Sequence, residues 1–140
     1  MIKIELNRLD SDLKMEATDS MGNKVVMDGS SADGGHDEGF RPMQMLLAAM
    51  GGCSVIDVVS ILKKQREELK DIKITVTGER EKDKVPSLYT EVHAHFKLFG
   101  KVDPDKAQRA VALSVGKYCS VVKTLEKTAT VTYSVEIINE

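Results

Sequence analysis

The two cysteines of this 140-residue chain, Cys53 and Cys119, are the side chains best able to do covalent chemistry. They stand 66 positions apart, and neither belongs to a CxxC pair. A four-ligand zinc pattern cannot be drawn through them, so no metal site is predicted. Scattered cysteines are most often inert core residues. The functional alternative is a redox pair, in which one thiolate is oxidised to a sulfenic acid and the other condenses with it to a disulfide.

Local sequence favours Cys119 as the more reactive thiol. It stands where a short helix is expected to begin, and a helix N-terminus stabilises a thiolate by up to about 1 kcal/mol. Cys53 lies well inside a longer expected helix, in the apolar stretch MLLAAMGGCSVIDVVSIL. It would need a nearby arginine or lysine, or a helix break at the glycine pair before it, to gain similar help.

Polar residues share a helix stripe with Cys53, namely Asp57, Ser60 and Lys64. Buried polar groups in such positions usually serve to satisfy one another. A carboxylate would also disfavour a neighbouring thiolate. We therefore interpret these residues as polar groups that satisfy one another at an interface between two copies of the chain.

His93 and His95 lie on the same face of one expected strand, where two imidazoles can bind a metal ion. Because no third or fourth ligand is evident, a polar outer face is the favoured interpretation. His36 lies in a loop and is expected to be exposed to solvent.

The elements that must position these residues follow the order βββ–α–ββ–αα–β, which makes the fold class α+β. Apolar alternation, turn residues and hairpin pairing predict strands in MIKIELNR, DLKMEAT, NKVVMD, DIKITVTGERE, LYTEVHAHFKLF and ATVTYSVEII. A long helix is predicted from Pro42 to about Leu69, and a shorter one begins at Asp103–Pro104. We expect one domain over residues 1–140, with an antiparallel sheet packed on the long helix. Residues 28–41 form an acidic, Gly- and Ser-rich loop that is expected to be mobile.

The first half of the long helix is apolar on nearly every side, so it must be covered all round. One sheet of the same chain covers one face only. Small residues at Ala48, Ala49 and Gly52 would let another backbone come close. The sequence therefore predicts a homodimer with this helix at its centre.

Composition excludes several classes of function. Hydrophobic residues make up 41% of the chain and charged residues 30%, which suits a folded domain. The net charge is −2 and the basic residues are scattered among acidic ones, so nucleic-acid binding is not expected. A signal peptide is not evident. The one long apolar stretch carries Asp57 near its middle, so we reject a membrane span and expect a cytoplasmic protein with reduced thiols.

Two segments, PMQMLLAAMGGCSVIDVV and KYCSVVKTLEKTATV, resemble the OsmC/Ohr family of osmotically inducible and organic hydroperoxide resistance proteins. The likeness covers nearly the whole chain and is greatest to the YhfA-like redox-protein branch. It implies the OsmC-like fold, in which two chains intertwine around paired central helices.

The resemblance also implies a cysteine-based peroxidase that needs no cofactor. In such proteins the cysteine of the long helix attacks an organic hydroperoxide, so Cys53 would be peroxidatic and Cys119 resolving, and a dithiol reductant would restore both. This assignment reverses the one that the helix dipole favours. The alternative is a non-enzymatic stress protein on the same scaffold, which would bind a small hydrophobic molecule or sense redox state.

Better-known hydroperoxidases of the family stabilise the thiolate with an arginine that a glutamate holds. The position of that glutamate, after the proline that opens the helix, is occupied here by Met43 and then Gln44. Gln44 can orient a donor but brings no charge. Arg41 and Arg8 are candidates for the arginine, and Arg41 is preferred because it adjoins the helix start.

Overall fold

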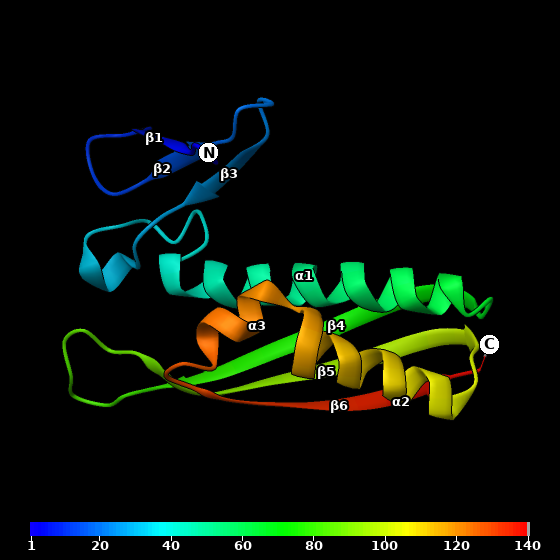
Figure 1. The fold of residues 1–140 in the computed structure, drawn as a ribbon. Helices are drawn as coiled ribbons and strands as arrows, with labels where there is room; N and C mark the ends of the chain where they lie inside the picture. The colour runs from blue at the N-terminus through cyan, green and yellow to red at the C-terminus, as the bar shows by residue number, and fades with distance from the viewer. Residues whose placement is uncertain (140) are drawn as a thin grey trace. The chain divides into compact units, whose positions relative to one another are not determined.

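The computed structural model describes residues 1–139. The chain divides into two compact units, Met1–Leu46 and Leu47–Glu140. The helix α1 (Pro42–Lys64) carries the chain from the first unit into the second, as Figure 1 shows. One domain over residues 1–140 remains a prediction.

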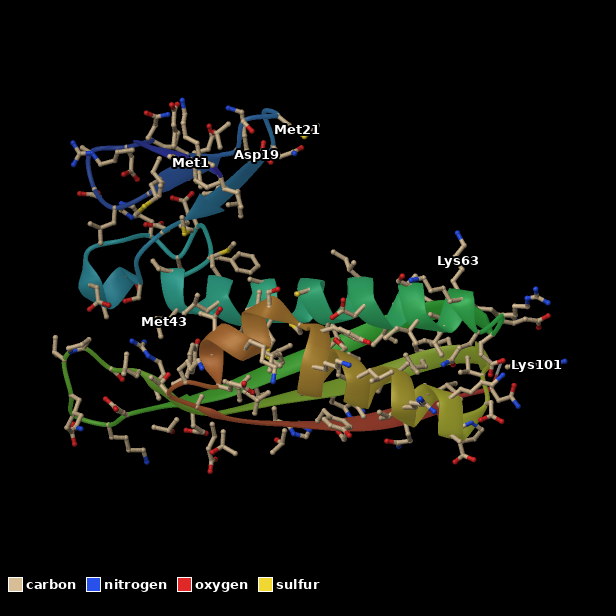
Figure 2. The ribbon with its side chains drawn as sticks, in the orientation of Figure 1. Met1, Asp19, Met21, Met43, Lys63 and Lys101 are labelled. Atoms are coloured by element: carbon tan, nitrogen blue, oxygen red, sulfur yellow. The ribbon has the colours of Figure 1, made fainter. Side chains whose placement is uncertain are left out.

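The first unit is built on a small antiparallel sheet in the order β1-β2-β3. Its strands are β1 (Glu5–Arg8), β2 (Met15–Thr18) and β3 (Lys24–Met27), which confirms the predicted meander. The turn between β2 and β3, where Figure 2 labels Asp19 and Met21, is closed by a carboxylate. Asp19 Oδ1 accepts hydrogen bonds from the backbone N–H groups of Met21 and Asn23 at 2.9 and 2.8 Å.

The loop over residues 28–41 is organised around one buried carboxylate, although its composition led us to expect mobility. Asp28 is only 1% exposed. It accepts hydrogen bonds from the backbone N–H groups of Gly29, His36 and Glu38 at 2.8, 3.0 and 3.2 Å. Burial by itself would raise the pKa of Asp28, but these N–H donors together hold that pKa below its ordinary value. A short 3-10 turn, η1 (Ser31–Asp33), lies within the loop.

The second unit contains a sheet in the order β4-β5-β6. The hairpin of β4 (Glu68–Arg80) and β5 (Tyr89–Lys101) is antiparallel, as predicted. However, β6 (Thr130–Ile138) runs parallel to β5, so the expectation of a wholly antiparallel sheet is wrong. The cause is the long connection between β5 and β6, which returns the chain to the starting end of β5. It holds α2 (Pro104–Leu113), the π-turn η2 (Ser114–Tyr118) and α3 (Ser120–Leu125).

The helix α1 ends at Lys64, five residues earlier than the predicted end at Leu69. Arg66 adopts a left-handed conformation with φ of 60°. Its N–H bonds to the carbonyl of Lys63, and the N–H of Glu67 bonds to the carbonyl of Leu62. These two bonds satisfy carbonyls that the helix leaves free, which is the usual way to stop a helix before a strand. A glycine normally marks this position, and its absence explains the error.

The core of the second unit lies between its sheet and its helices, which Figure 1 shows on one side of β4, β5 and β6. Alternate residues of β5 are buried and face the helices: Val92, Ala94, Phe96 and Leu98. The helix α2 buries Ala107, Ala110 and Val111. Its start follows the prediction, because the Asp103 side chain caps the helix and Pro104 occupies its first turn.

The second unit buries only part of the apolar surface of α1. Met50, Ser54, Val58 and Leu62 form a buried row with a spacing of four residues. By contrast, Ile56 is 71% exposed and Val59 is 39% exposed. By length and mean hydropathy alone α1 would suffice to cross a bilayer. Its buried row is instead typical of the core helix of a folded protein.

Candidate functional site

The two cysteines, 66 positions apart, come together in the second unit. The Sγ atoms of Cys53 and Cys119 and a carboxylate oxygen of Asp57 all lie within 4.8 Å of one another. Cys53 is half-buried on α1, whereas Cys119 is completely buried at the start of α3. The fold therefore creates a cysteine pair in which one residue is partly exposed and the other is fully buried.

Cys119 occupies the N-cap position of α3, where its sulfur closes the first turn. The backbone N–H of Val122 donates to Sγ over 3.4 Å, and the Ser54 hydroxyl donates to the same sulfur over 3.6 Å. Burial raises the pKa of the Cys119 thiol, and these two hydrogen bonds oppose that rise only in part. Burial therefore weighs against the argument that the helix start makes Cys119 the more reactive thiol, and the ranking of the two thiols stays a prediction. Loss of water around the sulfur outweighs the two hydrogen bonds.

Cys53 gains no fresh helix start, because α1 runs through Gly51 and Gly52 without a break. The two glycines differ in their surroundings. A Cβ atom on Gly51 would lie 3.4 Å from a methyl group of Val76 on β4, whereas one on Gly52 would meet nothing within 4 Å. Gly51 thus faces the sheet of its own chain, and Gly52 presents open backbone one residue before the accessible thiol.

Asp57 is held in place by a serine that sequence reasoning missed. The buried Ser114 hydroxyl donates to Asp57 Oδ2 over 2.9 Å. This contact agrees with the interpretation of Asp57 as a satisfied polar group, and it also fixes a carboxylate beside both sulfurs. Ser54 was missed as well. Its position in the otherwise apolar row of Met50, Val58 and Leu62 was a signal that could have found it.

A groove of about 560 Å³ adjoins the thiol pair and shares Asp57 with it. Its walls are formed by Asp57, Ser60, Ile61, Lys64, Gln65, Leu113 and Tyr118. The predicted helix stripe of Asp57, Ser60 and Lys64 therefore lines a groove. Gln65 Oε1 is buried and has no hydrogen-bond partner within residues 1–139, so it is available to an N–H or O–H donor.

Arg41 and Gln44 lie in the first unit, at the start of α1. The backbone N–H of Arg41 donates to Gln44 Oε1 over 3.0 Å, so Gln44 caps the helix. The Arg41 guanidinium pairs with the Asp37 carboxylate and donates to the carbonyl of Gly39 over 3.3 Å. Arg8 is exposed on β1. The activation of Cys53 by Arg41 or Gln44 stays a prediction.

Two groups of potential metal ligands occur among the described residues. One is the site of Cys53, Asp57 and Cys119. Zinc binds thiolates, so the buried thiol of Cys119, whose pKa is raised, would have to lose its proton. The other group consists of the half-buried Asp10 with the exposed Asp12 and His36, in which His36 Nε2 lies 2.8 Å from Asp12 Oδ2.

Known proteins resemble this chain in sequence and in fold. A family described as OsmC-like protein matches residues 35–134. Protein YhfA of Escherichia coli strain K12 is 44% identical over 118 residues, which make up 84% of each chain. The crystal structure of a hypothetical protein from Aquifex aeolicus VF5 is 34% identical and has a TM-score of 0.79, covering 98% of this chain and 97% of that one.

An organic hydroperoxide resistance protein, OsmC from Legionella pneumophila, covers 96% of both chains with a TM-score of 0.73. At 16% identity this likeness concerns the fold alone. The matches confirm the resemblance drawn from the two cysteine segments and the OsmC-like α+β fold. This chain belongs to the OsmC-like protein family.

Proposed function

We propose that this protein is a thiol-dependent peroxidase that reduces organic hydroperoxides through Cys53 and Cys119. The observation that supports it best is the unequal burial of two cysteines whose sulfurs lie within 4.8 Å of each other. An accessible thiol can meet a substrate, whereas a buried, protonated thiol is protected from it. This is the division of labour that a peroxidatic and a resolving cysteine require.

In the first step the Cys53 thiolate attacks one oxygen of the O–O bond of the hydroperoxide. The O–O bond breaks, an S–O bond forms, and the alkoxide leaves as an alcohol after it takes up a proton. Cys53 is oxidised to a sulfenic acid, and the hydroperoxide is reduced. The adjoining groove, with Ile61, Leu113 and Tyr118 among its walls, offers apolar surface to the organic part of the substrate.

In the second step the sulfur of Cys119 attacks the sulfur of the sulfenic acid. An S–S bond forms, the S–O bond breaks, and the hydroxide leaves as water. The thiol of Cys119 must lose its proton in this step. Asp57 lies beside both sulfurs and is a suitable acceptor. A dithiol reductant then reduces the disulfide, is itself oxidised, and returns both thiols.

We further propose that the working protein is a cytoplasmic homodimer. The exposed side chain of Ile56 and the open backbone at Gly52 lie on α1, close in sequence to the accessible thiol. A second copy would cover this apolar surface and exclude water from Cys53. Neither a metal ion nor an organic cofactor enters the proposed reaction.

A stopped-flow peroxide challenge tests the proposal. Reduced protein is mixed with tert-butyl hydroperoxide, and free thiols, sulfenic acid and disulfide are quantified by mass spectrometry over time. We expect rapid loss of both thiols, no reaction in Cys53→Ser, and arrest at the sulfenic acid in Cys119→Ser. Hydrogen peroxide run in parallel shows whether the organic group matters.

Thiols that survive an excess of the hydroperoxide would refute the peroxidase. The groove and its free Gln65 oxygen would then favour the alternative, a protein that binds a small molecule without reacting with it. The role of Arg41 is tested in the same assay. Arg41→Ala is expected to slow the first step more than Arg8→Ala, which removes the other candidate arginine.

A further inference from the structure

A row of hydrogen-bonded polar side chains crosses the sheet of the second unit, on the face opposite its helices. In the parallel pairing of β5 and β6, His93 lies opposite Thr132, and His95 lies opposite Ser134. Neighbouring residues of β5 point to the other face, where Val92, Ala94 and Phe96 are buried under the helices. Figure 2 shows side chains projecting freely from the helix-free side of this sheet.

Each imidazole in this row uses both of its nitrogens. His93 Nδ1 lies 2.7 Å from Thr132 Oγ1, and His93 Nε2 lies 2.9 Å from Ser134 Oγ. His95 Nδ1 lies 2.6 Å from Ser134 Oγ, and His95 Nε2 lies 3.2 Å from Glu136 Oε2. Two nitrogens from different histidines therefore converge on one point, the hydroxyl of Ser134.

The carboxylate at the end of the row sets the direction of these bonds when both rings are neutral. A carboxylate only accepts, so His95 Nε2 carries the hydrogen and Nδ1 presents a lone pair. Ser134 then donates its one hydrogen to His95 and accepts from His93. The lone pair on His95 Nδ1 therefore points at the Ser134 hydroxyl.

We propose that the space between these two nitrogens, beside the Ser134 hydroxyl, is a binding site for a divalent transition-metal ion of the Zn²⁺, Ni²⁺ or Cu²⁺ class. Its protein ligands are His93 Nε2 and His95 Nδ1, with water and the Ser134 oxygen available to complete the coordination. Imidazole nitrogen is the ligand that these metals share. The side chains of His95 and Glu136 are 34% and 48% exposed, so an ion can reach the site from solvent.

The outer partners of both rings suit a metal site. A ligating histidine usually donates its other N–H to an oxygen that fixes the ring. His95 already donates Nε2–H to Glu136. His93 meets the same requirement by moving its hydrogen from Nε2 to Nδ1, where Thr132 Oγ1 accepts it. The rings lose no proton in this change, and Ser134 gives up both its hydrogen bond to His95 and the one that it accepts from His93.

This site extends the sequence interpretation, which saw His93 and His95 but no further partner. Thr132, Ser134 and Glu136 lie about forty positions away along the chain, and only the parallel pairing of β6 with β5 brings them alongside. The proposed site uses no residue of the thiol pair, so it does not depend on the proposed peroxidase activity.

The test is a Zn²⁺ titration followed through the imidazole resonances of the full-length chain. The Cys53→Ser/Cys119→Ser double variant is used, because thiols also bind Zn²⁺. The chain has three histidines, so every ring can be followed. We expect saturable shifts of the His93 and His95 resonances at one equivalent, with those of His36 unchanged.

Variants then locate the ligands. His93→Gln and His95→Gln are each expected to weaken Zn²⁺ binding at least tenfold, and Glu136→Ala by about tenfold through the loss of the outer partner. His36→Gln is the matched control and should bind as before. A first response at His36, or no saturable shift of any ring with Zn²⁺ or Ni²⁺, would overturn the proposal. The spectra of the double variant decide this point even if a histidine variant folds poorly.

Discussion

The hydroxyl of Ser54 on α1 donates a hydrogen bond to the sulfur of Cys119 on α3, with 3.6 Å between Oγ and Sγ. This contact joins the residue after the accessible cysteine to the buried cysteine. It favours the thiolate of Cys119, because it opposes the rise in pKa that burial causes. Ser54, on the helix that carries Cys53, thus influences the ionisation of Cys119.

Ser54→Ala is expected to raise the pKa of Cys119 further and to slow the conversion of sulfenic acid to disulfide. Loss of one such hydrogen bond is worth about 1 kcal/mol, or about a fivefold change in rate. Rapid-quench mass spectrometry measures this step directly. Ser120→Ala, at an exposed serine beside Cys119, is the control and should react at the parental rate. Equal rates in both variants would show that the Ser54 contact is structural only.

Asp57→Asn is expected to slow disulfide formation by about tenfold or more while it leaves the first oxidation nearly unchanged. The substitution preserves the shape of the side chain and an acceptor for Ser114, but it removes the group that can take the proton from Cys119. The two steps are separated by trapping the sulfenic acid with dimedone. If disulfide forms at the parental rate, Asp57 is not the proton acceptor.

Gly52→Leu is expected to weaken dimerisation at least tenfold without lowering the stability of the single chain. Within residues 1–139 nothing lies within 4 Å of a Cβ atom placed on Gly52, so the new side chain would collide only with the proposed second copy. Analytical ultracentrifugation over a range of concentrations gives the dissociation constant. Gly116 also has open space around it, so Gly116→Leu is the matched control. Unchanged dimerisation of Gly52→Leu would place the interface elsewhere.

Asp28→Asn is expected to loosen the loop over residues 28–38, because an amide cannot accept from all three N–H groups that the carboxylate holds. The pKa of Asp28 in the folded state lies below its ordinary value of 3.8. Its contribution to stability is therefore present above that value and lost as the pH falls through the folded-state pKa.

Hydrogen exchange of the loop amides, measured between pH 7 and acid conditions, tests this prediction. We expect faster exchange in Asp28→Asn at neutral pH and a weaker dependence of stability on pH below about pH 5. Asp33→Asn, at an exposed aspartate in the same loop, should exchange as the parent does. Identical protection in parent and Asp28→Asn would mean that the carboxylate does not organise the loop.

Local patterns in the sequence predicted much of the fold. Apolar alternation together with turn and hairpin signals identified the six strands that the structure describes in residues 1–139, and the Asp103–Pro104 pair located the start of α2. These features depend on residues that are close together in the sequence, so they can be predicted from the sequence. The end of α1 escaped prediction because Arg66 adopts a conformation that glycine usually provides. The parallel pairing of β6 with β5 was not predicted, because the direction of β6 depends on the path of the whole connection between the two strands.

Prediction of the site was limited in the same way. The residue types identified Cys53 and Cys119 as a possible redox pair, the family resemblance suggested their roles, and the structure brings their sulfurs together. Local reasoning ranked Cys119 as the more reactive thiol, because a helix start is visible in sequence and complete burial is not. Ser114 gave no local signal, since its role arises only where the end of α2 meets Asp57.

The crossover between β5 and β6 has a further consequence for the thiol pair that it completes. A disulfide between Cys53 and Cys119 would close a chain loop of about 66 residues that encloses β4 and β5. Such a closure lowers the entropy of the unfolded chain by an amount worth about 4 kcal/mol. That is a large share of the stability of an ordinary domain. In each turnover the protein would alternate between a less stable dithiol form and a more stable disulfide form. Oxidation would raise its melting temperature until the reductant restores the thiols.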